Sequence, residues 1–381
     1  MRVLALVTDA WGGRGGIAKF NRDMLTSVGT HPNVTEVVAL PRVVSESMTN
    51  IPAGIRFDTG SAGSLVSFGC AVVSAAIRGA YDVVFCAHIN LLPFGYLAAR
   101  RRGVPLLMNI HGVDAWQPTS RSLTNRLINH VDRVVSVSDF TRQRFCDWSG
   151  LPEDRVSVLP NCIEEESFGV GPKPEYLLDR YDIHGRRVLL TVGRMSPLER
   201  YKGFDEILEV YPRLLERYED LVYLICGDGE DRQRLEAKAR ALGLQDRVIF
   251  AGYIPEEEKQ DHYRVADAFA MPGRGEGFGI VYLEALASGI PVVASKLDAS
   301  REAVMEGLLG EVVDPDDPAD LIRGISAALD RGAGTVPREL SHFSFESFKS
   351  RWHHLLDEWL FNEEPAASVT PGAPAAVYDS I

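Results

Sequence analysis

Short apolar runs rich in β-branched residues alternate with stretches of helical periodicity along the first part of the chain. The apolar runs span residues 3–7, 37–40, 82–87, 106–110, 134–137 and 156–159, and helical spacing is found at 18–28, 65–78 and 123–130. Buried strands separated by helices are typical of βαβ units, in which parallel strands are covered on both faces. The pattern therefore predicts an α/β protein with a parallel sheet.

The alternation stops at a polar, Pro- and Gly-rich stretch, residues 164–174, and then starts again. Strand runs follow at 187–192, 221–226, 247–252, 268–272 and 290–295, with helices at 204–218, 231–242 and 279–288. This organisation predicts two tandem doubly wound Rossmann-like domains, 1–166 and 167–342, that face each other across a cleft. Ligands are expected in that cleft, at the carboxyl ends of the strands. Residues 343–361 have an amphipathic helix pattern, and residues 362–381 predict a disordered tail.

The charge balance limits the classes of partner. The formal net charge is −13, which argues against nucleic acid as the main partner. Residues 1–166 carry a net charge of +1 and residues 167–381 a net charge of −14, so the first half is the part suited to an anionic surface. No apolar run reaches the roughly 18–20 residues of a membrane span, and no export signal is visible. Five scattered cysteines fit a reducing cytoplasm better than a disulfide framework.

Residues 13–18, Gly-Arg-Gly-Gly-Ile-Ala, fit the G-x-G-x-x-(G/A) pattern of a dinucleotide-binding turn. Two features weaken that interpretation. The preceding strand ends near Val7 or Thr8, several residues before the glycines, and the second strand is followed by Pro41 and Arg42 with no acidic residue to hold a ribose. An oxidoreductase is therefore a disfavoured alternative.

A glycine-rich segment in the second half, residues 271–295, predicts a binding site for a diphosphate. A strand ends near Pro272, a turn with Gly275, Gly277 and Gly279 follows, and a helix begins near Phe278. The free N–H groups and the positive dipole end of such a helix attract phosphate, and glycines let the backbone approach it.

Two acidic residues flank this predicted helix start. Glu276 and Glu284 are separated by a helical rise of about 12 Å, so their carboxylates could accept hydrogen bonds from sugar hydroxyls on either side of a diphosphate. The alternative interpretation is an ordinary charge at a helix start and a solvated helix face.

Two cations follow the first strand of the second domain. Arg194 comes directly after that strand, and Lys202 precedes Gly203. Placed in the cleft, both would neutralise a diphosphate and stabilise it as a leaving group. For either residue alone, an ordinary surface loop position is the simpler interpretation.

The ordered set of these motifs resembles a known family. Gly193-Arg194, Lys202-Gly203, the run Cys226-Gly-Asp-Gly229 and the E-x7-E segment from Glu276 to Glu284 are similar to the family-four retaining glycosyltransferases of the GT-B fold. The resemblance covers nearly the whole chain. It implies a GT-B architecture in which the helix within residues 343–361 crosses back to pack on the N-terminal domain.

The resemblance also implies roles for individual residues. Arg194 and Lys202 would contact the donor diphosphate, Glu276 the transferred sugar, Glu284 the ribose, and the backbone of Gly277, Phe278, Gly279 and Ile280 the sugar and phosphate. The nucleotide would lie near Gly229, Tyr253 and Ile254, and His111 would lie close to the transferred sugar. The acceptor or phosphate would lie near Gly15, Gly16, Asp114, Ser138 and Asn161. Arg194, Lys202, Glu276 and His111 are the predicted catalytic residues. For His111, a strand end without chemical function is the alternative.

The sequence departs from the family pattern at two points. The usual Pro-Asn-Gly-Val-Asp run has Cys162 in place of its glycine and Glu164 in place of its aspartate, and the usual Gly-Arg-Leu is Gly-Arg-Met here. The first change puts the geometry of the turn after Asn161 in doubt.

The resulting functional hypothesis is a metal-independent, retaining hexosyltransferase with no cofactor besides its donor. It would move a mannosyl or glucosyl group from GDP- or UDP-hexose to a glycan, glycolipid or lipid-linked acceptor in cell-surface polysaccharide or glycoconjugate biosynthesis. A sugar-nucleotide epimerase and a non-catalytic nucleotide-sugar-binding protein are the alternatives. Arg100, Arg101, Arg102, Arg121 and Arg126 suggest contact of a cytoplasmic protein with the inner face of the plasma membrane, and a solvated helix end explains them equally well.

Overall fold

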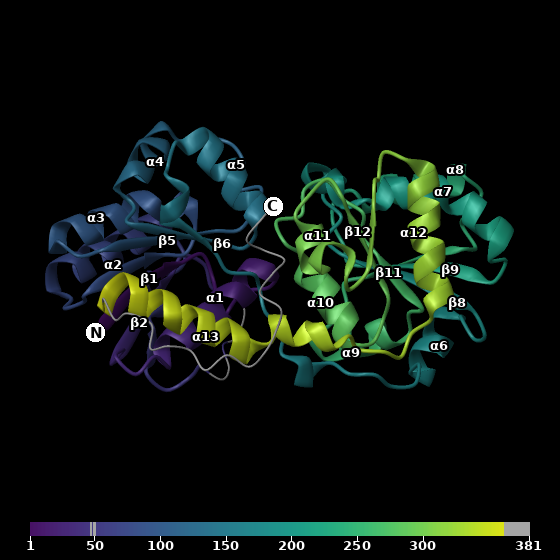
Figure 1. Cartoon of the computed structure of the whole chain (residues 1–381), viewed down its shortest axis with the longest axis horizontal. Coiled ribbons are helices and arrows are strands. Elements are labelled where there is room, and N and C mark those ends of the chain that lie inside the picture. The colour runs from purple at the N-terminus through teal and green to yellow at the C-terminus, as the bar shows by residue number, and fades with distance from the viewer. Residues whose placement is uncertain (46–47, 49–50, 362–381) are drawn as a thin grey trace.

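The chain folds into two α/β lobes that lie side by side and contact each other (Figure 1). The computed structural model describes residues 1–45, 48 and 51–361. The predicted disordered tail, 362–381, lies outside the described residues. Each lobe contains one sheet in which all strands are parallel, as the alternating pattern predicted.

The N-terminal sheet has the strand order β3-β2-β1-β4-β5-β6-β7. Its strands are β1 (Arg2–Val7), β2 (Glu36–Pro41), β3 (Ile55–Phe57), β4 (Val83–Cys86), β5 (Leu106–Ile110), β6 (Arg133–Ser136) and β7 (Val156–Val158). Its helices are α1 (Gly16–Gly29), α2 (Leu65–Arg78), α3 (Leu92–Arg102), α4 (Ser122–Leu127) and α5 (Asp139–Ser149). The order reverses between β1 and β4, and a crevice opens at such a point because the connections leave toward opposite faces of the sheet.

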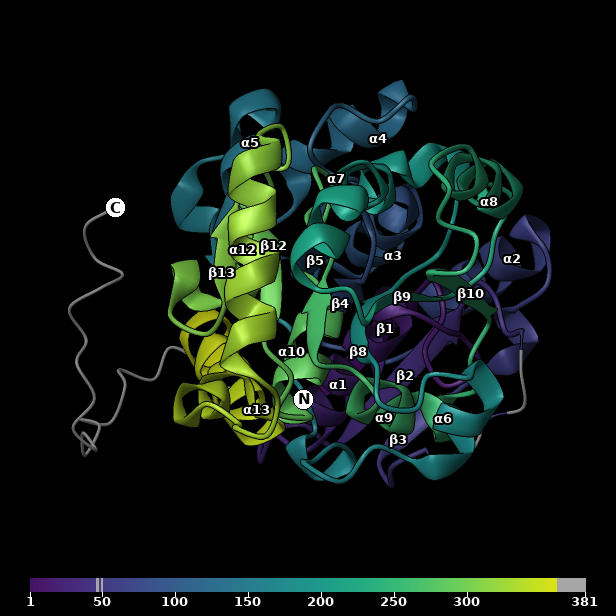
Figure 2. The ribbon, with the colours of Figure 1, turned by 90° about the vertical axis from the view of Figure 1, so that its right-hand side faces the viewer.

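The C-terminal sheet has the order β10-β9-β8-β11-β12-β13, with the corresponding reversal between β8 and β11. Its strands are β8 (Arg187–Val192), β9 (Leu221–Cys226), β10 (Val248–Gly252), β11 (Ala268–Ala270), β12 (Val292–Ser295) and β13 (Glu311–Val313). Its helices are α6 (Glu175–Tyr181), α7 (Phe204–Arg217), α8 (Arg232–Ala241), α9 (Glu256–Arg264), α10 (Ile280–Ala287), α11 (Ser300–Ala303) and α12 (Pro318–Arg331). Figure 2 shows α12 lying over this sheet, where Leu321 and Ile325 join the same apolar cluster as Val293 and Val313.

The local sequence explains where several of these elements begin. Ser64 and Ser67 form a reciprocal capping box at the start of α2, which spans the predicted residues 65–78. Ser138 caps α5 through a hydrogen bond that its hydroxyl accepts from the Thr141 backbone. Strands such as β1 and β9 are buried on both faces because helices cover both sides of a parallel sheet.

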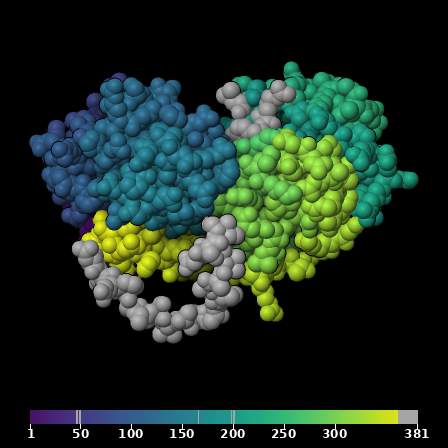
Figure 3. Space-filling view, turned by 45° about the horizontal axis from the view of Figure 1, so that its top comes forward, coloured from purple at the N-terminus to yellow at the C-terminus, as the bar shows by residue number. Residues whose placement is uncertain are grey.

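The last helix crosses back to the N-terminal lobe (Figure 3), where it lies against α1. In α13 (Phe345–Leu356), Phe348 and Trp352 are buried, and the Phe348 ring meets Phe20 of α1 edge to face at 5.7 Å. The His353 ring Nε2 lies 2.9 Å from the Ser27 carbonyl oxygen. Within the predicted span 343–361, the α-helix ends at Leu356 and a π-helical turn follows over Asp357–Phe361.

Candidate active site

A cavity of about 840 Å³ lies between the two lobes. Its walls consist of the segments that follow the strands at their carboxyl ends, including β1 and β4 in the N-terminal sheet and β8 and β11 in the C-terminal sheet. These four strands flank the reversal points of the two sheets. The cavity therefore lies where doubly wound sheets bind their ligands.

Most of the predicted site residues meet in this cavity. The lining includes Gly15, Gly16, His111, Asp114, Asn161, Arg194, Lys202, Tyr253, Glu276, Gly277, Phe278, Gly279 and Ile280. Four predicted residues are not among the lining: Ser138, Gly229, Ile254 and Glu284.

The two predicted diphosphate-binding cations lie on the C-terminal wall together with two carboxylates. The Lys202 Nζ is 3.5 Å from Glu276 Oε2 and 3.7 Å from Glu199 Oε2, and the Arg194 guanidinium pairs with Glu199. The Arg194 side chain is 71% exposed, whereas that of Lys202 is 17% exposed. Glu199 was not predicted, because only the folded loop brings it between the two cations.

The glycine-rich segment after β11 differs from the predicted geometry. The helix α10 begins at Ile280, after Gly279 adopts a left-handed φ of 93°, so Glu276 lies in the preceding loop. The helical spacing that was expected to separate Glu276 from Glu284 therefore does not apply. The start of α10 still faces the cavity, because Gly279 and Ile280 both line it, and the first N–H groups of a helix have no partners within the helix.

Glu284 is buried in the core of the C-terminal lobe. Its side chain is 3% exposed, and its carboxylate accepts hydrogen bonds from the Lys259 ammonium at 2.6 Å and the Tyr263 hydroxyl at 2.7 Å. Burial and the neighbouring Glu284 carboxylate raise the pKa of Tyr263, so this hydroxyl stays protonated and donates. The predicted contact of Glu284 with a ribose stays a prediction.

Three further predicted residues lie outside the cavity lining, namely Ser138, Gly229 and Ile254. Ser138 is buried as the cap of α5. Gly229 packs so closely on the Met195 carbonyl oxygen that a Cβ there would lie 1.8 Å from it. Ile254 is partly buried against the main apolar cluster.

The N-terminal wall contains two neutral histidines. Burial lowers the pKa of His111 to about 4 and that of His88 to about 3, with the His111 charge contributing to the second shift. The His111 Nε2 lies 2.8 Å from the Ala87 carbonyl, which can only accept, so Nε2 carries the proton. The Asn90 backbone N–H donates to His88 Nδ1, so His88 also carries its proton on Nε2. His88 was not predicted as a site residue, although it directly follows the run 82–87.

Asp114 lies beside these histidines. Its Oδ1 accepts a hydrogen bond from the His111 backbone N–H, and its Oδ2 lies 3.8 Å from His88 Nε2. Among the described residues, Oδ2 is buried without a hydrogen-bond partner. Burial raises the pKa of Asp114 to about 7. The Asn161 side-chain oxygen is likewise buried without a partner among those residues, and both groups line the cavity.

The two walls touch each other at the edge of the cavity. A Cβ on Gly277 would lie 2.0 Å from the His111 carbonyl oxygen, and a Cβ on Gly112 would lie 2.7 Å from the Gly277 Cα. The Arg14 guanidinium stacks over the Tyr253 ring at 4.5 Å from its centroid. The structure therefore has its two lobes in contact.

Within residues 1–45, 48 and 51–361, one group of side chains has the spacing of metal ligands. It consists of Glu175, Asp179 and His184, all exposed and none of them in the cavity lining.

Comparisons with known proteins agree with this fold. Residues 32–167 match the family described as Glycosyltransferase Family 4, and residues 179–341 match Glycosyl transferases group 1. The crystal structure of Anabaena Alr3699/HepE in complex with UDP and glucose has a TM-score of 0.73 to this chain at 20% identity, covering 93% of this chain and 99% of that one. This structural likeness supports the GT-B fold.

Mycobacterial mannosyltransferases are among the curated relatives. A GDP-mannose-dependent alpha-(1-6)-phosphatidylinositol monomannoside mannosyltransferase of Mycolicibacterium smegmatis is 35% identical over 62% of this chain, and the match spans 63% of that relative's own length. A phosphatidyl-myo-inositol mannosyltransferase of Mycobacterium leprae is 31% identical over 77% of this chain and 76% of the relative. With both lobes matched and the GT-B fold in place, the chain belongs to glycosyltransferase family four.

Proposed function

We propose that the protein is a retaining hexosyltransferase that uses a nucleotide sugar as donor. The observation that carries this proposal is the convergence of Arg194, Lys202 and the start of α10 on one cavity, opposite the glycine loop of the other lobe. Two cations and the N–H groups at the start of a helix together match the charge and the hydrogen-bonding capacity of a diphosphate. The mannosyltransferase names of the relatives make GDP-mannose the first donor to test, with UDP-hexoses next.

The proposed chemistry has no protein nucleophile. A hydroxyl oxygen of the acceptor attacks the anomeric carbon on the face from which the diphosphate leaves. The new C–O bond forms as the bond to the phosphate oxygen breaks, and the acceptor proton passes to that departing oxygen. Arg194, Lys202 and the α10 N–H groups stabilise the developing negative charge, and Glu276 accepts hydrogen bonds from the sugar hydroxyls. No metal ion or further cofactor is part of the proposal.

Replacing Lys202 tests this assignment. In Lys202→Ala, turnover should fall by about two to three orders of magnitude, because one charged stabiliser of the leaving group is lost. Lys296→Ala is a matched control, since Lys296 pairs with Asp320 at the surface and is not part of the cavity lining. Both variants should keep the wild-type melting temperature within a few degrees. Near-normal transfer by Lys202→Ala would refute the assignment.

The two alternative functions require a different experiment. Incubation with the donor alone distinguishes them from transfer, because an epimerase would return an isomerised nucleotide sugar and a non-catalytic protein would return the donor unchanged. A transferase should release the nucleoside diphosphate slowly, by hydrolysis, when the donor is present alone. The release should become faster when an acceptor is added.

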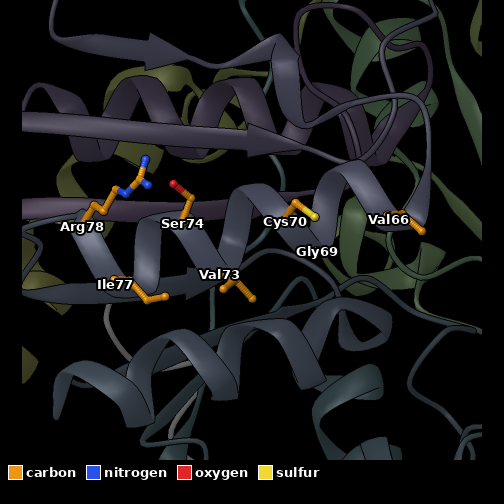
Figure 4. Close-up of a pocket in the computed structure, with 7 residues that line it drawn as sticks. All are labelled: Val66, Gly69, Cys70, Val73, Ser74, Ile77 and Arg78. Carbon is orange, nitrogen blue, oxygen red and sulfur yellow. The ribbon is translucent and has the colours of Figure 1, made fainter.

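We also propose that the acceptor is lipid-linked and that α2 contacts an anionic membrane surface. Val66, Val73 and Ile77 are exposed on α2 and lie along a shallow surface pocket that also includes Cys70 and Arg78 (Figure 4). The neighbouring α3 ends in Arg100, Arg101 and Arg102, and no helix among the described residues is long and apolar enough to cross a bilayer. Exposed apolar side chains beside arginines suit the boundary between lipid headgroups and acyl chains.

Vesicle sedimentation tests the membrane contact. The protein should sediment with vesicles that contain anionic lipid and stay in solution with zwitterionic vesicles. The double variant Val73→Ser with Ile77→Ser should lose sedimentation while keeping donor hydrolysis, because these residues lie outside the interlobe cavity. Equal sedimentation of the variant and the wild type would contradict a role for α2.

A further inference from the structure

A carboxylate from the C-terminal lobe binds the first turn of a helix in the N-terminal lobe. Glu302 of α11 accepts a hydrogen bond from the Asp139 backbone N–H at 2.7 Å and another from the Phe140 N–H at 2.8 Å. These residues open α5, and they lie 163 and 162 positions away from Glu302 in the sequence. The first N–H groups of a helix lack internal partners and carry its positive dipole end, so a two-oxygen anion suits them.

Glu302 is rigidly connected to the loop that carries Glu276. The buried Asp298 accepts hydrogen bonds from the Glu276 backbone N–H at 2.9 Å through Oδ2, and from the Ser300 hydroxyl at 2.6 Å through Oδ1. The Ala299 N–H donates to the Glu276 carbonyl at 3.1 Å. The predicted donor loop and the short helix α11 thus form one unit, because both oxygens of one buried carboxylate are used to join them.

On the other side, α5 is connected to the wall that carries His111 and Asp114. The Trp116 indole N–H donates to the Thr141 hydroxyl at 3.0 Å, and the Trp116 ring meets Phe140 at 5.2 Å. The loop that contains Trp116 begins at His111, directly after β5. A change in the position of the α5 start would therefore move the N-terminal wall of the cavity.

We propose that Glu302 is a positioning residue that latches the two cavity walls together in the closed arrangement of the lobes. The inference rests on the proposed transferase function, since it assigns to Glu302 the alignment of the donor loop with the acceptor wall. Glu302 is not part of the cavity lining, and it acts through Asp298 on one wall and through α5 on the other. Its loss should therefore impair transfer more than nucleotide binding.

Glu302→Gln is the sharpest single test because it keeps the size of the side chain. An amide has one acceptor oxygen, so one of the two N–H groups would face an NH2 group instead. We expect the kcat of transfer to fall 10- to 100-fold, while the Kd of a nucleoside diphosphate, measured by calorimetry, changes less than threefold. Small-angle scattering with nucleotide present should show a larger radius of gyration than for the wild type. Glu306→Gln is the matched control, because Glu306 pairs with Arg301 at the surface.

Asp139→Pro tests the same latch from the opposite lobe. Proline is favoured at the first position of a helix, and Ser138 before it has the extended backbone that a following proline requires. This variant removes one N–H donor to Glu302 and keeps the backbone hydrogen bonds of α5. It also removes the Asp139 carboxylate, which contacts Gln143 and Arg142, so Asp139→Ala, which keeps the N–H group, is its control. It should reproduce the kcat loss, and the double variant should be no worse than the more affected single variant, because both act on one contact.

The outcomes separate the latch from the proposed function. If the wild-type protein neither binds a nucleoside diphosphate nor transfers a sugar, the proposed function fails. If the wild type transfers and Glu302→Gln has wild-type kcat and scattering, the latch is refuted. A lower melting temperature with unchanged kcat in both variants would also overturn it, since that result indicates a contact that only stabilises the fold. Should Glu302→Gln not fold, Asp139→Pro decides.

Discussion

The two glycine-rich loops on opposite walls of the cavity have different surroundings. In the N-terminal loop, a Cβ on Gly15 would meet nothing within 4 Å, and one on Gly16 would reach only the Ile280 Cδ1 at 3.8 Å. In the C-terminal loop, a Cβ on Gly277 would lie 2.0 Å from the His111 carbonyl oxygen, and one on Gly279 would lie 2.5 Å from the Tyr282 ring. The first loop leaves space beside Gly15 and Gly16, although a Cβ on Gly13 would lie 2.3 Å from Asp9 Oδ2, and the second loop is packed against protein at Gly277 and Gly279.

This difference indicates that similar glycine motifs meet different requirements. Gly15 has a φ of 86°, a conformation that glycine adopts at low cost, and the space beside it can admit a ligand. Gly277 allows the backbones of the two lobes to touch. The walls also differ in their polar groups, since two neutral histidines lie on one beside Asp9, Arg14 and Asp114, and Arg194 and Lys202 paired with carboxylates lie on the other. We therefore expect the C-terminal wall to bind the anionic donor and the N-terminal wall the acceptor.

Among the variants that test this difference between the walls, Gly277→Ala should have the largest effect. The added methyl would force the walls apart by roughly 1 Å, and a misplacement of that size can lower a rate about 100-fold. We expect kcat to fall by about that factor while each lobe remains folded, as judged by circular dichroism. Gly69→Ala is a control within α2, where the nearest atom would be the Phe94 ring at 3.4 Å. Unchanged activity in Gly277→Ala would show that the walls do not need this contact.

A second variant tests whether Glu284 of α10 stabilises the core or binds a ligand. In Glu284→Gln, the Lys259 ammonium loses its buried carboxylate partner, and we expect a loss of about 2–4 kcal/mol in unfolding free energy. Denaturant unfolding measures this loss, and calorimetry measures nucleotide affinity at a temperature where the variant is folded. Weaker nucleotide binding without a loss of stability would instead support the predicted contact with a ribose.

The neutral histidines of the N-terminal wall predict how stability depends on pH. Their pKa values in the fold, about 4 for His111 and about 3 for His88, lie below the unfolded value of 6.5. Their contribution to stability is present above about pH 6.5 and is lost as the pH falls toward 4. The raised pKa of Asp114, about 7, has the opposite effect on stability. Between about pH 6.5 and 4.5 the folded protein binds a proton at Asp114 that the unfolded chain does not bind, and this offsets the effect of one histidine. Together these three groups should contribute a loss of about 1.4 kcal/mol per pH unit between pH 6.5 and 4.5.

Asp114→Asn should remove the offset and steepen the pH dependence of the unfolding free energy by about 1.4 kcal/mol per pH unit. Urea unfolding at several pH values measures it, and the wild type at the same pH values is the reference. An unchanged slope would mean that Asp114 does not take up a proton in the folded protein.

The smallest effect should come from Gly16→Ala. The methyl has room in the structure and stands at the first position of α1, where alanine is well tolerated, so the unfolding free energy should change by less than about 1 kcal/mol. If a ligand approaches this backbone, affinity for the nucleotide sugar or the acceptor should fall severalfold. Equal affinities in a titration would show that no ligand comes close to Gly16.

Much of the fold follows from local sequence patterns. Helix α2 begins and ends at the residues predicted from its periodicity, and the described parallel strands lie within or beside the predicted apolar runs, except β3 and β13, which were not predicted. The cavity residues Arg194, His111 and Asn161 could be predicted because each follows a strand, and the carboxyl ends of parallel strands share one edge of a sheet. His88 has the same signal and was missed because no motif marks it.

Other features depend on residues that are distant in the sequence. The π-helical end of the last helix, the burial of Glu284 and the start of α10 depend on how neighbouring elements pack. The same holds for Glu199 between two cations and for Glu302 at the start of α5.

The amino-acid sequence by itself determined the alternation of strands and helices, the two parallel sheets and the strand ends from which the cavity is built. These properties depend on residue periodicity and backbone preferences within short segments. Only the tertiary structure decided which carboxylates face the cavity, which are held in the core and which join the two lobes. A carboxylate can satisfy its charge with a cation, a hydroxyl or a helix start, and only the folded arrangement determines which of these lies within hydrogen-bonding distance.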